Sequence, residues 1–123
     1  MGNPLLQAIF KRRSVRAFTH QAIPDDIFAA ILEAARLAPS TVNLQTWAFG
    51  VFDNGLLWQQ TFGKPIPFYG SQAVIVIADT YRDRQVLDVF PYSPLVEYTI
   101  AVMNASLAAM NMNSRPKPWA SLL

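Results

Sequence analysis

Two stretches in the first third of the chain carry apolar residues at helical spacing. The first predicts a short helix that ends near Lys11 or Arg12 and carries Leu5, Leu6, Ile9 and Phe10 on one side. The second predicts a helix that begins at Pro24, with acidic residues in its first turn. Because Pro39 disfavours a helical residue before it, we expect this helix to stop at Ala38. Its apolar stripe consists of Ile27, Phe28, Ile31, Leu32 and Ala35.

A third helical pattern predicts a long helix from Pro94, with Ser93 as the candidate N-cap. Its large apolar residues recur at spacings of four and three, as the core positions of heptads do: Val96, Ile100, Met103, Leu107 and Met110. Its alanines form a surface that permits close approach of another helix: Ala101, Ala105, Ala108 and Ala109. Since the segment is apolar on nearly all sides, we expect a core helix buried on several sides.

Two short apolar runs predict strands. Residues 47–52 read as a strand ended by Asp53-Asn54-Gly55, and residues 73–78 are expected to form a buried strand because they are short and β-branched. Residues 56–62 fit a short helix, 63–70 a loop, and 79–92 a polar, irregular stretch. The order of helices and strands predicts an α+β fold with mixed layers.

Composition narrows the function classes. The 123 residues are 52% hydrophobic and 15% charged, against roughly 25% charged in an average soluble protein. A domain of this size cannot hide so much apolar surface in one monomer, so we expect either an oligomer or absent covering structure. A net charge of +2 is too small to indicate nucleic-acid binding.

Metal and membrane chemistry are not indicated either. The chain has no cysteine, and its one histidine, His20, is interpreted as a loop or helix-start residue rather than a metal ligand. No apolar run is long enough to cross a bilayer, and no signal peptide is recognisable. We therefore expect a cytoplasmic protein without a membrane partner.

Concentrated positive charge follows the first predicted helix. Arg12, Arg13 and Arg16 surround the hydroxyl of Ser14. Guanidinium groups suit bidentate contact with phosphate or with a polar ring edge. Alone, the cluster fits a solvated basic loop, a kinase site at Ser14, a nucleic-acid patch or an anionic-cofactor site.

A second polar stretch, residues 38–45, joins an apolar helix to a strand. Its sequence is Ala-Pro-Ser-Thr-Val-Asn-Leu-Gln, so hydroxyl and amide groups lie at Ser40 and Asn43. Such groups can read the edge of a heterocycle by donating and accepting hydrogen bonds. An ordinary capped turn fits the same residues.

Together the two stretches resemble the nitroreductase family of FMN-dependent oxidoreductases. The matching pattern is RRSVRAF at 12–18, IPDD at 23–26 and ILEAARLAPS at 31–40, followed by Asn43, Gln45 and WAF at 47–49. The resemblance is dense over residues 5–52 and looser through 73–78 and 96–112. It implies a nitroreductase-like α+β fold that works as a homodimer, with a flavin site between the two subunits.

The resemblance also implies residue roles. Arg12, Arg13, Ser14 and Arg16 match the segment that contacts the FMN phosphate, ribityl chain and pyrimidine edge, and Pro39, Ser40 and Asn43 match the segment that reaches the flavin from the partner subunit. Arg16 is the candidate to stabilise negative charge on the reduced flavin. No side chain is needed as an acid–base catalyst, because the cofactor carries the chemistry.

The implied reaction passes a hydride from NAD(P)H to flavin N5 and onward to nitroaromatic, quinone or similar small-molecule acceptors. Two other readings belong to different classes. One is a non-catalytic module that dimerises or binds flavin weakly, and the other is a small anion-binding protein with an accidental likeness.

The chain departs from the family pattern at two places. Thr46 stands where the family commonly has proline. In addition, the sequence stops where the family is little beyond halfway, so we expect one partial domain over 1–123, incomplete at its C-terminus, with an atypical tail at 114–123. Codons permitted for this tail, read one base earlier, can spell an alanine-rich continuation, so we hypothesise a frameshift.

Overall fold

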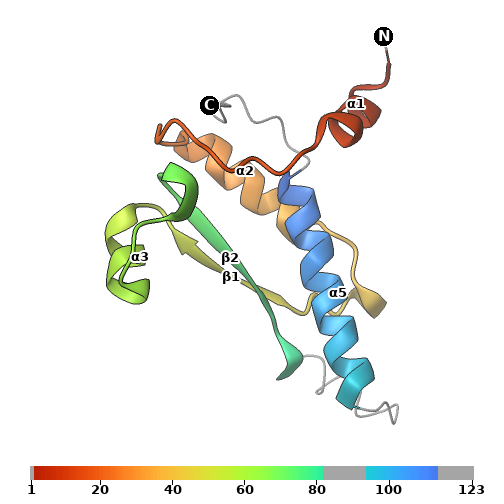
Figure 1. Ribbon diagram of the computed structural model, residues 1–123. Helices are drawn as coiled ribbons and strands as arrows, with labels where there is room; N and C mark the ends of the chain where they lie inside the picture. The colour runs from red at the N-terminus through yellow and green to blue at the C-terminus, as the bar shows by residue number, and fades with distance from the viewer. Residues whose placement is uncertain (1, 82–93, 114–123) are drawn as a thin grey trace.

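The computed structural model describes residues 2–81 and 94–113 and has an α+β architecture (Figure 1). The main elements in chain order are α1 (Pro4–Lys11), α2 (Asp25–Arg36), β1 (Trp47–Phe52), α3 (Gly55–Phe62), β2 (Ala73–Ala78) and α5 (Pro94–Asn113). Two short 3₁₀ turns occupy Thr41–Asn43 and Pro67–Tyr69. The α+β prediction is confirmed, and both predicted strands have the expected bounds.

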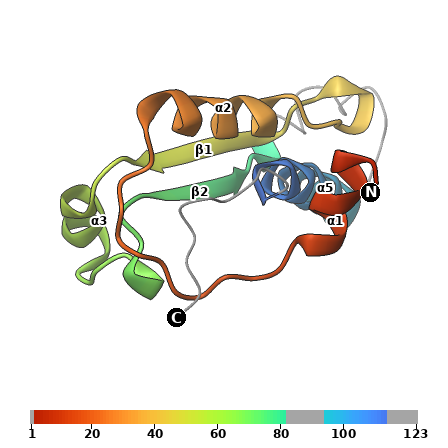
Figure 2. The same cartoon turned by 90° about the horizontal axis from the view of Figure 1, so that it is seen from above.

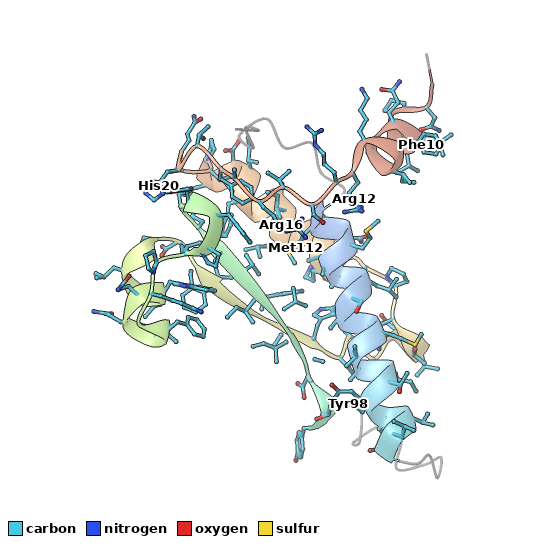
Figure 3. The ribbon with its side chains drawn as sticks, in the orientation of Figure 1. Phe10, Arg12, Arg16, His20, Tyr98 and Met112 are labelled. Atoms are coloured by element: carbon cyan, nitrogen blue, oxygen red, sulfur yellow. The ribbon has the colours of Figure 1, made fainter. Side chains whose placement is uncertain are left out.

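Helix α1 is stabilised by local N-terminal capping, and its apolar side is exposed. The Asn3 side chain accepts a hydrogen bond from the Leu5 amide at 2.8 Å, and Pro4 occupies the first helical position. Phe10 projects away from the rest of the chain and is 80% exposed (Figure 3). Leu5, Leu6 and Ile9 are exposed too.

Helix α2 ends at Arg36, two residues before the predicted end at Ala38. Leu37 already departs from helical geometry, with φ −85° and ψ 4°, although its amide still reaches the Glu33 carbonyl at 3.1 Å. The reason is that Pro39 disfavours the helical conformation for Ala38, so the chain leaves the helix earlier.

The two strands form an antiparallel pair in which Trp47 lies opposite Ala78 and Phe52 opposite Ala73. Figure 2 shows α2 running alongside β1, with α5 seen nearly end-on. The prediction that 73–78 is a buried strand is wrong: β2 is half-buried, and Ile77 is 46% exposed. Among the described residues the sheet has only these two strands, so its surface is incompletely covered.

Helix α5 packs against α2 and both strands, but through its small residues. The buried positions are Ala101, Asn104, Ala105 and Ala108, and Ala108 joins Ala35, Ala38 and Trp47 in the core. The predicted heptad core is therefore wrong for its large members, since Val96, Met103, Leu107 and Met110 are exposed. Alanines bring the α5 backbone close to its neighbours, and the bulky side chains are left on the outer side.

Three predictions fall on residues that the structure does not describe. They concern the N-cap at Ser93, most of the 79–92 stretch, and the tail at 114–123. Within the described ranges, no helix combines the length and apolarity that crossing a membrane requires.

Candidate cofactor site

The arginine stretch leaves α1 as extended backbone, with Arg12 at φ −62° and ψ 133°. Arg12, Arg13, Ser14 and Arg16 are all exposed. Within the described part of the chain, none of these four side chains makes a hydrogen bond or ion pair, and the one ion pair found there joins Arg36 to Glu33. Their donors are thus available to an external anion.

The residues that follow are fixed to the rest of the fold. Three hydrogen bonds hold 18–23 against 68–72: Phe18 N to Phe68 O at 3.0 Å, Ser71 Oγ to Gln21 O at 2.9 Å, and Ile23 N to Gln72 Oε1 at 2.7 Å. His20 lies in this loop, as one reading of the sequence predicted, with Nδ1 3.1 Å from the Tyr69 carbonyl. The arginine stretch is therefore presented from an anchored strap rather than from a helix.

The second polar stretch forms a tight loop with unusual backbone geometry. Val42, Asn43 and Gln45 have positive φ values of 44°, 56° and 53°. Non-glycine residues adopt this left-handed region only when their surroundings enforce it, and such strain concentrates at functional sites. Ser40 Oγ accepts from the Gln45 amide at 3.0 Å, so its hydroxyl shapes the turn. Pro39 and Asn43 are exposed.

A buried asparagine of α5 holds this loop, and no sequence pattern had singled it out. Asn104 Oδ1 accepts from the Thr41 amide at 3.1 Å, and Asn104 Nδ2 donates to Thr46 Oγ1 at 2.9 Å. Asn104 is 1% and Thr46 0% exposed. The available signal was an amide on the same helical face as Ala101, Ala105 and Ala108, since a polar residue on a buried face needs partners.

The two stretches do not meet within one chain. Figure 3 places Arg12 and Arg16 at the level of Met112 along α5, whereas the loop is bound at Asn104. Eight residues of helix span roughly 12 Å. No hydrogen bond or ion pair joins the two stretches among residues 2–81 and 94–113.

The charge environment is simple. In α2, the Arg36 guanidinium donates to both Glu33 carboxylate oxygens, from Nε at 2.8 Å and Nη2 at 2.6 Å. This hydrogen bonding holds the pKa of the Glu33 carboxyl below its usual value. No cluster of three metal-ligating side chains occurs in the described residues. The two candidate stretches offer guanidinium, hydroxyl and amide groups.

The chain is similar in sequence to proteins of one known family. Residues 9–58 match the Nitroreductase family. A protein of Archaeoglobus fulgidus, provisionally named NADH dehydrogenase/NAD(P)H nitroreductase, is 37% identical over 110 residues, covering 85% of this chain and 60% of the relative. These matches support membership of the nitroreductase family.

Solved structures agree with the nitroreductase fold. The structure of Bacillus megaterium NfrA2 matches 92% of this chain and 50% of its own, with a TM-score of 0.71 and 18% identity. A protein of Exiguobacterium sibiricum, provisionally named a nitroreductase and solved in complex with FMN, matches 91% of this chain and 69% of its own, with a TM-score of 0.70 and 19% identity.

The matched family segment contains both candidate stretches, since it runs from α1 to the middle of α3. The chain spans 60% of the length of its archaeal relative.

Proposed function

We propose that this chain acts as an FMN-dependent oxidoreductase that passes a hydride from NAD(P)H to nitroaromatic, quinone or similar acceptors. The observation that carries the proposal is the free guanidinium cluster of Arg12, Arg13 and Arg16, inside the segment that matches the family. A nitroreductase-fold structure that contains FMN supports the choice of cofactor.

The available donors fit this cofactor. FMN carries a phosphate, a hydroxylated ribityl chain and a pyrimidine edge, so it needs cations and neutral donors along one extended surface. The stretch from Arg12 to Arg16 supplies three guanidinium groups and the hydroxyl of Ser14 on exposed, extended backbone. When bound, FMN supplies the hydride chemistry through its N5 atom.

Each residue has a specific binding role in this proposal. Arg12, Arg13 and Ser14 would hold the phosphate and ribityl chain, and Arg16 would place a positive charge at the pyrimidine edge. The charge of Arg16 favours the reduced form of the bound cofactor by Coulomb attraction.

Pro39, Ser40 and Asn43 would complete the site from a partner subunit. Separation of the loop from the arginine stretch within one chain supports this arrangement, because a single chain leaves each half without the other. Asn43 is exposed, and its side-chain amide can donate and accept at a heterocycle edge.

The outer face of α5 supports a homodimer. A groove of about 450 Å³ runs along this face and is lined mainly by apolar atoms of Tyr98, Thr99, Val102, Met103, Ser106 and Leu107. Contiguous exposed apolar surface of this kind marks an interaction site, and a two-fold axis would bury the same face of both copies.

Titration of the purified protein with FMN tests the proposal. We expect bound flavin, visible in the absorbance spectrum, and oxidation of NAD(P)H that depends on a nitroaromatic or quinone acceptor. If the protein carries no flavin after excess FMN is added and the free FMN is removed, the oxidoreductase proposal is contradicted. A module that dimerises without catalysis would then be favoured.

A matched pair of arginine variants identifies the site. Arg16→Leu should weaken FMN binding by roughly tenfold or more, since a charge-assisted contact is lost. Arg36→Leu makes the same change in side chain and net charge at a residue that pairs with Glu33 on α2. Equal FMN affinities for the two variants would exclude Arg16 from the site.

A further inference from the structure

We propose that Asn104 is a positioning residue that holds the 40–46 loop in the shape needed to present Asn43 to the flavin. The expected effect on flavin binding rests on the proposed function. The hydrogen bonds between Asn104 and the loop do not depend on any cofactor. Asn104 contacts the loop and has no assigned contact with the flavin itself.

The geometry shows a clamp across both ends of the loop. One amide group of α5 accepts from Thr41 N near the start of the loop and donates to Thr46 Oγ1 at its end, at 3.1 and 2.9 Å. Asn104 and Thr46 are almost fully buried, so water does not replace the bond between them when it is lost. The clamp therefore fixes the loop from beneath while Asn43 stays exposed.

The loop needs such a restraint because its conformation is unfavourable by itself. Val42, Asn43 and Gln45 all adopt left-handed backbone, and residues other than glycine tend to relax from it to other conformations. The internal bonds of the loop, such as Leu44 N to Thr41 O at 3.0 Å, close the turn but do not attach it to the fold. The loop is attached to the fold by a backbone bond from Asp79 N to Thr46 O at 3.0 Å and by the side chain of Asn104.

The clamp also joins the two proposed functional surfaces. Asn104 lies on the inner face of α5, whereas its sequence neighbour Met103 lies on the outer face and is 53% exposed. Helix α5 would thus position the loop with one face and contact the second copy with the other.

The same helix offers a matched control. Asn111 Nδ2 donates to the Ala34 carbonyl of α2 at 2.9 Å, so it also ties α5 to a neighbour but does not touch the loop. Comparing Asn104→Ala with Asn111→Ala separates loop positioning from general loss of a tertiary hydrogen bond.

The experiment measures three quantities for both variants: the FMN dissociation constant from flavin fluorescence, the exchange rate of the Thr41 amide in the protein without FMN, and unfolding stability. We expect Asn104→Ala to raise the dissociation constant about tenfold and to accelerate Thr41 exchange. Asn111→Ala should lower stability while changing the dissociation constant less than about twofold.

A second pair of variants keeps the test decisive if Asn104→Ala does not fold. Thr46→Val removes the hydroxyl that pairs with Asn104 and keeps the shape, whereas Thr46→Ser keeps the hydroxyl. We expect weaker FMN binding for the valine variant and near-normal binding for the serine variant. Equal binding by the two would overturn the proposal.

The two proposals fail in different ways. If the unaltered protein binds no FMN, the proposed function is wrong, and Thr41 exchange still decides whether Asn104 restrains the loop. If the unaltered protein binds FMN but Asn104→Ala binds it as well as Asn111→Ala does, the positioning role is wrong.

Discussion

The two faces of α5 differ in a way that organises the whole molecule. The inner face carries small residues and one asparagine, and it is buried against α2 and the strands. The outer face carries Met103, Leu107 and Met110, which are 53%, 41% and 43% exposed. The chain thus packs the small side chains of α5 against itself, whereas these bulky side chains stay largely exposed.

Apolar periodicity alone therefore does not identify which face of a helix is covered within the chain. Alanine contributes little area per residue but permits a short distance between backbones, so a face of alanines can be the better internal contact. Large apolar residues on the opposite face then provide the area that a second copy can bury.

The largest effect is expected from enlarging the inner face. Ala108 is fully buried between α2 and the strand residue Trp47. Ala108→Leu should lower the free energy of unfolding by about 3 kcal/mol, because the added carbons have no space. Denaturant unfolding measures this loss. Ala29→Leu makes the same change at an exposed position of α2, and an equal loss there would show that the inner face is not tightly packed.

A charge on the outer face should affect assembly instead of folding. Leu107→Glu places a carboxylate in the apolar groove. We expect the dimer dissociation constant to rise about 100-fold, with little change in the stability of the monomer. Sedimentation velocity over a range of concentrations measures the shift. Gln60→Glu adds the same charge at an exposed position of α3, and if it dissociates the dimer equally the α5 groove is not the interface.

The smallest effect is expected on the exposed side of α2, the helix whose other side covers the alanines of α5. Hydrogen bonding from Arg36 lowers the pKa of Glu33 below its ordinary value, so the pair contributes stability above that ordinary pKa. The contribution disappears as pH falls through the lowered value. Because both side chains are exposed, it is small and weakened by salt.

Thermal unfolding of Glu33→Gln across pH checks this prediction. Its midpoint should lie slightly below that of the unaltered chain at neutral pH and converge with it in acid. If the difference between the two midpoints instead grows in acid, ionised Glu33 does not stabilise the fold and this prediction is wrong.

The sequence predicted the local elements well because their signals are local. The bounds of both strands follow from the apolar runs at 47–52 and 73–78, and Asn54 and Gly63 mark the ends of α3 through a side-chain cap and a left-handed residue. The partial exposure of β2 was not predictable from its β-branched residues, because burial depends on which other elements pack against the strand.

The sequence points to the residues proposed to contact FMN, but not to the residue that holds the loop. Clustered arginines indicate anion binding by their charge, so residues 12–16 stand out in a chain with few charges. The Asn104 clamp involves partners 58 and 63 positions away, at Thr46 and Thr41. No local pattern reports such a contact, and only the packing of α5 brings these groups together.

Complementation between two defective chains tests whether the FMN site is shared between subunits. Arg16→Glu damages the arginine stretch, Asn43→Asp damages the loop, and each variant alone should bind FMN poorly. If the site forms between two copies, co-expression gives about half mixed dimers, each with one intact site, so about a quarter of the sites recover FMN binding. No recovery in purified mixed dimers would contradict a site shared between subunits.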